Sequence, residues 1–444
     1  MNTKNQFAYP KPSVAWFAVA ILMLAYTCSF IDRLILSLLV EPIKADLDIS
    51  DFRISFLQGL SFALFYTVAG IPVGRIVDSH RRTSIIAIGI ALWSLMTAVT
   101  ALAQRYWHLF LARAGVGVGE ATLTPAAYSI ISDLFPPERR GFALGLFSSG
   151  TSIGAGLALI IGGYAINVLN AAGPQTWPII GTLEPWRLAF IYVGLPGLLV
   201  AILVLMIPEP VRQLRSAAGT IEARQSIPVR EIVAHYRQHA SVISLHHLGM
   251  SFSAMAAYGI MSWAPVMLIR TQGWTPGDAG LVTGVSILVA GTAGVIGGGW
   301  LGDLWTRRGQ KTGRLNIAGL SMIMSAVGAA FYPLANSLGG IVPFFMLTIL
   351  GAFMVIGCGA AVLLDIMPNR LRGQATAIYF FVISLAGIGL GPTIVATFTD
   401  FIFGDPAAVR YSLVIVPTIG FSLGAMFFLL ARKPYVRSME QLKS

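Results

Sequence analysis

The sequence has few of the residues that build disulfide frameworks and metal sites. Among 444 residues there are two cysteines and six histidines, and Cys28 and Cys358 both lie in apolar segments. A disulfide-stapled fold is therefore excluded, and neither a CxxC nor an HExxH spacing is present. His235 and His239 have the i, i+4 spacing of a helical metal pair, but no carboxylate or cysteine motif accompanies them. We expect no metal and no cofactor, and no enzymatic role.

Charge is also scarce. Charged residues make up 11% of the chain and hydrophobic residues 56%, which is too apolar for the surface of a soluble domain. This composition predicts a polytopic membrane protein. The net charge of +11 would suggest nucleic acid in a soluble protein, but in a membrane protein it is explained by basic residues in cytoplasmic loops. We therefore expect membrane lipids as surroundings and no nucleic-acid partner.

Apolar runs long enough to span a bilayer recur along the chain. The predicted spans are 14–40, 53–77, 83–103, 107–133, 139–169, 185–207, 238–270, 278–303, 313–335, 340–365, 370–401 and 408–432. A polar, arginine-rich stretch separates the sixth span from the seventh. The prediction is an all-α integral membrane protein of twelve transmembrane helices, with an N-terminal six-helix bundle at 1–207, a cytoplasmic linker at 208–237 and a C-terminal six-helix bundle at 238–444.

The distribution of basic residues predicts the orientation. With both termini in the cytoplasm, most Lys and Arg residues, including those of the linker, fall on the cytoplasmic side. The opposite side then holds Lys44, Arg53, Arg105, Arg187, Arg270 and Arg410. The positive-inside rule therefore places both termini inside, with the protein in the inner (plasma) membrane.

Two landmarks occur once in each predicted half. Gly74 to Asp78, followed by Arg81 and Arg82, corresponds to Gly299 to Asp303, followed by Arg307 and Arg308. DLFPPERRG, residues 133–141, likewise corresponds to DIMPNRLRG, residues 365–373. Two six-helix repeats with a site between them are typical of a secondary transporter.

The predicted span 107–133 carries two opposite charges on one face. Arg113 and Glu120 are seven residues apart, which is about two turns, or roughly 10 Å along a helix axis. Gly115 and Gly119 lie between them and allow another helix to approach closely. The first span adds Asp32 and Arg33. Because an ionisable residue at membrane depth costs about 2.5 kcal/mol or more, these residues indicate a transport route.

Two interpretations of these four residues remain open. The first is a structural pairing of helices, with Asp32 bound to Arg113 and Arg33 bound to Glu120. The second is coupling, because burial favours a neutral carboxylic acid and a nearby guanidinium favours the carboxylate, so that helix movement changes proton affinity. We prefer the second and predict Glu120 and Asp32 as proton-coupling residues, with Arg33 and Arg113 receiving substrate and relaying charge.

These motifs resemble the major facilitator superfamily over essentially the whole chain. Within it, IDR at 31–33, RAGVGVGEA at 113–121, ISDLFPPERRG at 131–141 and WRLAF at 186–190 are similar to the spinster-type transporters of lysolipids and sphingolipids. The resemblance implies alternating access between two six-helix halves. Two features depart from the superfamily pattern: Ser79 stands where an arginine is usual, and the fifth span lacks the Gly-Pro of the antiporter motif.

The resemblance also implies a conformational latch at the duplicated landmarks. Each acid would bind a helix N-terminus or a loop arginine in one conformation. The predicted latch residues are Gly74, Asp78, Arg81, Arg82, Asp133, Arg140, Asp303, Arg307 and Arg372. A set of solvated turn residues is the alternative.

The second half has no charged residue near the centre of its predicted spans. A charged wall opposite an apolar wall suits an amphipathic anion, with the arginines receiving the head and the apolar wall an acyl chain. We predict a monomeric, proton-coupled transporter of such a lipid, moving lysolipid or sphingolipid-like molecules. A carrier or exporter of small organic anions or drugs is the alternative within transport, and a non-transporting receptor or scaffold is the alternative of another class.

Overall fold

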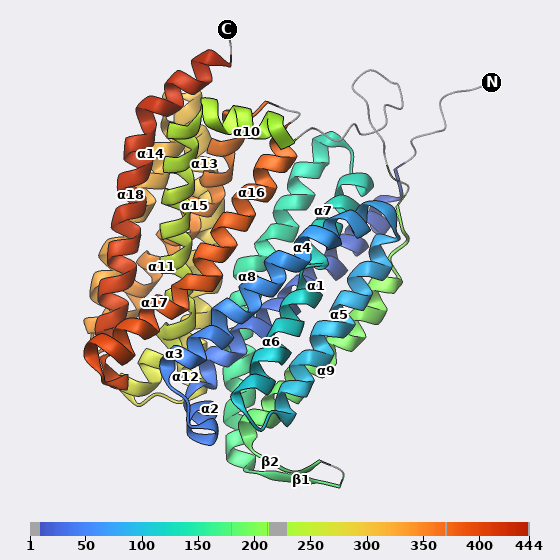
Figure 1. Cartoon of the computed structure of the whole chain (residues 1–444), viewed down its shortest axis with the longest axis vertical. Helices are drawn as coiled ribbons and strands as arrows, with labels where there is room; N and C mark the ends of the chain where they lie inside the picture. The colour runs from blue at the N-terminus through green and yellow to red at the C-terminus, as the bar shows by residue number, and fades with distance from the viewer. Residues whose placement is uncertain (1–8, 179, 211, 213–228, 369–370, 443–444) are drawn as a thin grey trace, which may run out of the picture.

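The computed structural model describes residues 9–178, 180–210, 212, 229–368 and 371–442, and helices make up nearly all of it (Figure 1). Within these residues, eleven helices are long and apolar enough to cross a membrane. A twelfth predicted span, 107–133, is present as two shorter helices, α6 and α7. The prediction of an all-α protein with twelve membrane-crossing segments is confirmed, although one segment is broken.

The first half of the chain forms nine helices and a small hairpin. The helices are α1 (Pro12–Leu38), α2 (Val40–Leu47), α3 (Asp51–Ser55), α4 (Ser61–Ser79), α5 (Arg82–Val99), α6 (Tyr106–Glu120), α7 (Leu123–Leu134), α8 (Pro137–Ala172) and α9 (Pro185–Leu205). The strands β1 (Gln175–Trp177) and β2 (Gly181–Leu183) pair antiparallel, with Thr176 opposite Thr182. The sequence analysis did not predict this hairpin.

The second half forms the remaining helices. They are α10 (Val229–Gln238), α11 (Ala240–Gln272), α12 (Pro276–Ser286), α13 (Thr292–Arg307), α14 (Gly313–Phe331), α15 (Leu338–Asp365), α16 (Arg372–Ser384), α17 (Gly391–Thr397) and α18 (Val409–Gln441). Much of the predicted linker, namely residues 211 and 213–228, lies outside the described residues. The helix α10 occupies the end of the stretch predicted as linker, and Arg212 donates to the carbonyl oxygens of Val77 and His80 at the end of α4.

Proline explains the break between α6 and α7. Pro125 has no backbone N–H to give to the carbonyl of Ala121, and its ring crowds that carbonyl. The chain instead tightens at this point, with Thr122 N and Thr122 Oγ1 both bonded to the carbonyl oxygen of Gly119. Glu120 is the last residue of α6. The break therefore places a predicted functional carboxylate at a helix end.

Wider, π-helical turns interrupt three other spans. They lie at Phe56–Leu60 between α3 and α4, at Ile287–Gly291 between α12 and α13, and at Leu385–Leu390 between α16 and α17, and a further π-helical turn, Phe398–Phe403, follows α17. Such turns often occur at functional positions because they locally change the direction of a helix. These turns all lie in spans that contact the other half of the chain.

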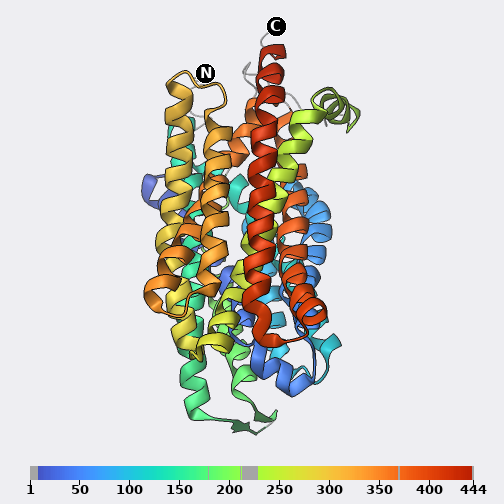
Figure 2. The same cartoon turned by 90° about the vertical axis from the view of Figure 1, so that its left-hand side faces the viewer.

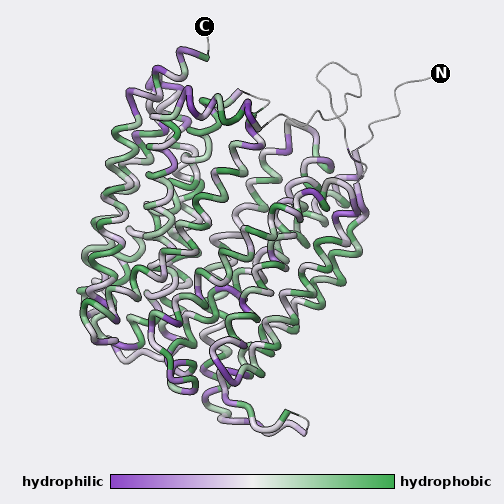
Figure 3. Tube along the Cα trace, viewed as in Figure 1, coloured by the Kyte–Doolittle hydropathy of each residue, from purple (hydrophilic) through white to green (hydrophobic). Residues whose placement is uncertain are grey.

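The helices gather into two groups that follow the order of the chain (Figure 1). In the first, α1 packs on α8, α5 on α9 and α4 on α6; in the second, α11 packs on α18 and α14 on α15 and α18. Between the groups, α8 packs against α12, and α3 against α17. Both termini lie at one end, and the hairpin lies at the other (Figures 1 and 2). Hydrophilic residues gather at both ends, and the middle is mostly hydrophobic (Figure 3).

Candidate functional site

The four predicted charged residues come together on α1 and α6. Asp32, Arg113 and Glu120 are 3%, 1% and 1% exposed, and the Arg33 side chain is 14% exposed. The first and fourth predicted spans therefore bring two carboxylates and two guanidinium groups together in the interior of the first helix group. We call Asp32, Arg33, Arg113 and Glu120 the charged cluster.

Arg33 and Glu120 form an ion pair. Arg33 Nε donates to Glu120 Oε2 at 2.6 Å, and Arg33 Nη2 contacts the same oxygen. The guanidinium also lies against aromatic rings, 4.5 Å from the centroid of Phe62 and 5.1 Å from that of Phe30. Guanidinium groups bind aromatic faces favourably, because the ring face is negative. Arg33 is thus held between a carboxylate on α6 and rings on α1 and α4.

Arg113 does not pair with the carboxylate of Asp32. Its Nη1 donates to the backbone carbonyl oxygen of Asp32 at 2.9 Å, and no ion pair joins the two side chains among the described residues. Several polar atoms of the cluster are buried without a hydrogen-bond partner: Asp32 Oδ1, Glu120 Oε1, Arg113 Nε and Arg113 Nη2. Of the two structural pairs considered from the sequence, the Arg33–Glu120 pair is present, and the Asp32–Arg113 side-chain pair is absent.

Glycines bring α6 close to its neighbours. A Cβ at Gly119 would stand 2.7 Å from the carbonyl oxygen of Gly89 on α5, and one at Gly117 would stand 2.6 Å from that of Phe62 on α4. A Cβ at Gly115 would meet the Met96 side chain at 2.6 Å. The predicted close approach of another helix backbone is confirmed at Gly119, whereas at Gly115 the neighbour is the Met96 side chain, and it is Gly117 that meets the α4 backbone.

An ion-pair network joins the two helix groups at the end opposite the termini. Arg270, near the end of α11, donates to both carboxylate oxygens of Asp51 at 2.5 and 2.7 Å and to Glu41 at 2.7 Å. Lys44 also binds Asp51, at 2.5 Å, and Asp51 is fully buried. Phe52 N donates to Asp400 across the same interface at 2.7 Å. The sequence analysis placed Lys44 and Arg270 on this side but predicted no partner for either.

Backbones of the two groups also touch where α8 packs on α12. A Cβ at Gly156 on α8 would stand 2.7 Å from both the Gly284 carbonyl oxygen and Leu288 Cβ, and one at Gly163 would stand 2.6 Å from the Pro276 carbonyl oxygen. Only glycine permits such an approach without displacing a neighbour. The interface opposite the termini is therefore tightly packed, and we call it the closed end.

At the terminal end, the ion pairs of Arg82 and Arg314 found among the described residues join side chains of the same half. In the first half, Arg82 binds Asp133 at 2.5 Å, Glu209 at 2.7 Å and the carbonyl oxygen of Pro210 at 2.8 Å. In the second half, Arg314 occupies the corresponding position. It binds Asp365 at 2.5 Å and Asp303 at 2.8 Å.

Arg82, Asp133 and Asp303 were predicted from the sequence as latch residues, whereas Arg314, Glu209 and the role of Asp365 were not. Arg314 follows the second GxxxD landmark and opens α14, as Arg82 follows the first and opens α5. Aligning the two repeats beyond the landmarks would have identified Arg314 as the counterpart of Arg82.

The other predicted latch residues have local surroundings. Arg81 Nε donates to Thr83 Oγ1, Arg140 Nη2 to the Phe135 carbonyl oxygen and Arg372 Nε to the Met367 carbonyl oxygen. Arg307 is exposed, and a Cβ at Gly74 would meet nothing within 4 Å. The side chain of Asp78 lies outside the described part of the chain. The latch itself stays a prediction.

Glu209 lies outside the membrane-length helices, and its surroundings shift its pKa. Burial alone would raise the pKa of this carboxyl, but hydrogen bonds from Arg82 and from the backbone of Thr83 outweigh burial and hold the pKa below its usual value of 4.5. The carboxylate form is therefore favoured. Glu209 ties the segment after α9 to the start of α5.

Two further patterns lead to no catalytic or metal site. Residues 150–154 read GTSIG, a match to the GxSxG pattern of hydrolases. Ser152 lies inside the continuous helix α8 and bonds to the Ser149 carbonyl and to Thr292 Oγ1, so the strand-turn-helix elbow is absent. Among the described residues, no group of three or more His, Cys, Asp or Glu side chains is arranged to hold a metal.

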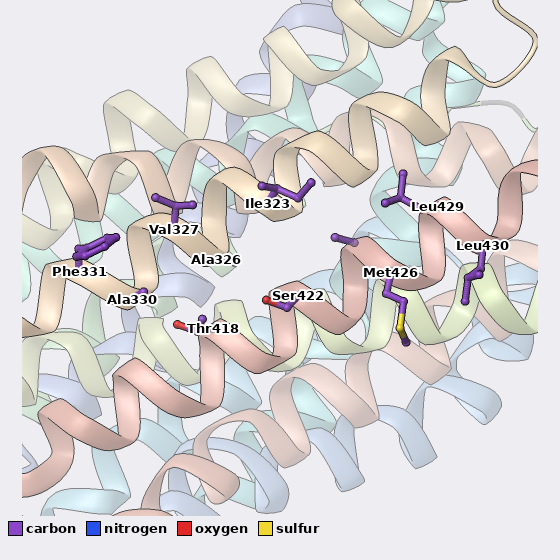
Figure 4. Close-up of a pocket in the computed structure, with 11 residues that line it drawn as sticks. Ile323, Ala326, Val327, Ala330, Phe331, Thr418, Ser422, Met426, Leu429 and Leu430 are labelled. Carbon is purple, nitrogen blue, oxygen red and sulfur yellow. The ribbon is translucent and has the colours of Figure 1, made fainter.

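A cavity of about 590 Å³ lies between α14 and α18, far along the chain from the charged cluster (Figure 4). Its lining is almost entirely apolar and includes Ile323, Phe331 and Met426, with Thr418 and Ser422 as its hydroxyl groups. It contains no charged residue, so it lacks the chemistry predicted for an anionic substrate. We do not assign the substrate to it.

Residues 22–392 match the Major Facilitator Superfamily. The chain belongs to this family. It is 26% identical to an MFS-type efflux pump of Mycolicibacterium smegmatis over 96% of this chain and 95% of that protein. It is 27% identical to Protein spinster homolog 1 of Bos taurus over 92% of this chain and 79% of that protein.

A solved structure of a bacterial homologue of the human lysosomal transporter Spinster, in an inward-facing and occupied conformation, superposes with a TM-score of 0.76 at 25% identity. The match covers 97% of this chain and 98% of that one. The protein is therefore a multi-pass membrane transporter of the major facilitator superfamily that is related to the spinster proteins.

Proposed function

We propose that this transporter moves an amphipathic anionic lipid, of the lysolipid or sphingolipid class, by proton-coupled alternating access. The observation that carries the proposal is the buried Arg33–Glu120 ion pair, with unpartnered atoms of Asp32, Glu120 and Arg113 beside it. Buried pairs of this kind contribute little net stability, and ionisable groups at membrane depth are typical of functional sites.

Competition for Arg33 supplies the coupling. A phosphate or carboxylate head that binds the Arg33 guanidinium displaces the Glu120 carboxylate, because both anions need the same guanidinium N–H donors. A displaced Glu120 carboxylate would be an unpaired charge in a buried site, and taking up a proton removes that cost. Release of the head reverses both steps. Asp32 precedes Arg33 on α1, and its carboxylate forms no ion pair among the described side chains, so it is the second proton site.

The acyl chain needs an apolar surface near the cluster. On α16, Phe380 and Phe381 are 48% and 46% exposed, and Tyr258 on α11 packs with core residues of the first half. Other large side chains of the second half are buried in the core, namely Met261, Trp263, Met354 and Tyr379. Phe380, Phe381 and Tyr258 are therefore our candidates for the apolar wall.

The asymmetry of the two ends supports alternating access. We place both termini in the cytoplasm and the protein in the inner membrane. The closed end then lies on the side away from the cytoplasm, and the conformation is inward-facing. The closed end depends on pairs between the halves, whereas the ion pairs that Arg82 and Arg314 form among the described residues each lie within one half. Opening outward would break the first set and leave the second free to form new contacts.

Uptake into proteoliposomes under an imposed pH gradient tests the proposal. We expect a labelled lysolipid to accumulate against its gradient and collapse of the pH gradient to stop accumulation. Absence of flux for every compound would identify a receptor or scaffold. Accumulation that persists after the pH gradient is collapsed would refute proton coupling.

A drug exporter is the second candidate, because the mycobacterial relative is an efflux pump. The aromatic rings around Arg33 would also accept a flat apolar compound. The same vesicles separate the two candidates: a drug exporter transports a hydrophobic dye that carries no anionic head and ignores lysolipid. Charge removal at Arg33 would then leave dye transport intact.

A further inference from the structure

The helix α10 lies across the terminal end of the second helix group, crosswise to the long helices (Figures 1 and 2). Its inner face is firmly docked. His235 Nε2 donates to the carbonyl oxygen of Ile366 at 2.9 Å, and His239 Nδ1 bonds with Ser438 Oγ at 2.9 Å. Both histidines are buried. The position of α10 is therefore fixed by contacts with the segment after α15 and with α18.

A groove of about 330 Å³ runs between α10, α11 and the side chain of Ile378 on α16. Ile232 and Tyr236 of α10 and Ile243 of α11 supply most of its apolar lining, and Arg237 stands at its rim. Leu248 follows the lining residue Ser244 by one turn of α11 and is 42% exposed, so the surface of α11 beside the groove is apolar. Its apolar part is thus open to lipid.

Two polar groups of the groove have no protein partner among the described residues. Arg237 is exposed, and no carboxylate lies within ion-pair distance of it. The hydroxyl oxygen of Tyr236 is buried and makes no hydrogen bond. Burial of the Tyr236 hydroxyl raises its pKa to about 12, so it keeps its proton and remains a donor. A buried donor without an acceptor costs free energy that a ligand oxygen would recover.

We propose that this groove binds one anionic phospholipid, with an acyl chain along Ile232, Ile243 and Ile378 and the phosphate on the Arg237 guanidinium. The Tyr236 hydroxyl donates to an oxygen of the same lipid. Charge complementarity decides the occupant: a neutral lipid would fill the apolar part but leave Arg237 without a counter-charge. An amphipathic helix lying crosswise at a bundle end, with arginine on its polar face, is the arrangement that binds anionic headgroups.

Binding of a fluorescent, short-chain phosphatidylglycerol to the purified full-length protein in neutral detergent tests this inference. We expect Arg237→Gln to weaken binding about fivefold, the factor for one basic residue near an anionic headgroup. Ser244→Leu keeps every charge and narrows the groove, and it should weaken binding as well. Arg308→Gln is the matched control, because Arg308 is exposed at the same end but lies outside the groove, and its affinity should equal that of wild type.

Competition experiments separate the lipid from its headgroup alone. We expect unlabelled phosphatidylglycerol to displace the probe, and phosphatidylcholine of the same chain length and free glycerol phosphate to displace it poorly. Equal displacement by phosphatidylcholine would refute the role of Arg237, and equal displacement by glycerol phosphate would refute the role of the groove. Equal probe affinity in Arg237→Gln and Arg308→Gln would overturn the whole inference. None of these results depends on transport.

Discussion

The two ends of the helix bundle use the same kinds of residue differently. At the closed end, Arg270 of the second half binds Asp51 of the first, and Gly156 and Gly284 allow backbones of opposite halves to meet. At the terminal end, Arg82 and Arg314 each bind carboxylates of their own half. A Cβ at Gly70, Gly141, Gly145 or Gly373 would meet nothing within 4 Å.

The comparison shows which contacts hold this conformation. Under the alternating access proposed above, ion pairs and close backbone contacts between halves would break as the closed end opens, while the networks inside each half would move with their helices. A rearrangement of this kind is a rigid movement of two bodies about their interface. On this proposal, the contacts at the closed end set the balance between conformations, and those at the terminal end contribute to the stability of each half.

The largest expected effect follows from removing the cation between the halves. Arg270→Gln leaves the buried Asp51 carboxylate with Lys44 alone, and breaking a buried pair costs about 3–5 kcal/mol. The closed end should open more often. With Cys28 and Cys358 replaced, a cysteine at Gln58, whose amide donates to the Ser262 carbonyl of the other half, should be labelled faster from the side opposite the termini.

Arg314→Gln is the control for that experiment. It removes bonds to Asp303 and Asp365 within one half, so it should lower the melting temperature and leave labelling at position 58 unchanged. If Arg314→Gln accelerated labelling as much as Arg270→Gln, the two ends would not differ in the way that their contacts indicate.

A second, smaller effect concerns two glycines of the same helix. Gly156→Ala places a methyl group against Gly284 and Leu288 of the other half, and overpacking of this kind costs about 1–3 kcal/mol. Gly145→Ala meets open space and should be neutral or stabilising by up to about 1 kcal/mol, because alanine favours helix. Melting temperatures of the two variants test this pair. Greater damage from Gly145→Ala would contradict the assignment of the closed end.

The smallest effect is a pH dependence at the terminal end. Glu209 has a lowered pKa in the folded protein, so its bonds to Arg82 and Thr83 contribute stability above pH 4.5, and this contribution is lost as the pH falls through the lowered value. Partial exposure limits the contribution to about 1 kcal/mol or less. The melting temperature of wild type should exceed that of Glu209→Gln at pH 7, and the gap should close on acidification. A gap that does not change with pH would exclude this role for Glu209.

Sequence reasoning recovered the features that depend on local pattern. Apolar run length predicted the twelve spans, and the seven-residue spacing of Arg113 and Glu120, with glycines between, predicted a buried charged face. The break after Glu120 was also encoded, because Pro125 stands four residues beyond Ala121. We predicted one continuous helix there because the whole stretch 107–133 is long and apolar enough to span a bilayer.

Pairings between distant segments could not be predicted. Arg270 and Asp51 are 219 residues apart, and each appears in the sequence as a charge near the end of a span. Only the packing of the two halves shows that they meet. Arg113 likewise binds the backbone of Asp32 and not its carboxylate, a choice that depends on how α1 and α6 cross. Partner choice is a property of the fold, whereas burial of charge was evident from the sequence.

Transport by Glu120→Gln in proteoliposomes tests the central claim most directly. The amide cannot release a proton, so the variant should show no lysolipid accumulation driven by a pH gradient. Exchange of labelled for unlabelled lysolipid should continue, because Arg33 remains able to bind the head. A structural role for the Arg33–Glu120 pair predicts instead a lowered melting temperature and loss of exchange. If Glu120→Gln accumulates lysolipid uphill with the same dependence on the pH gradient as wild type, Glu120 does not couple proton movement to transport.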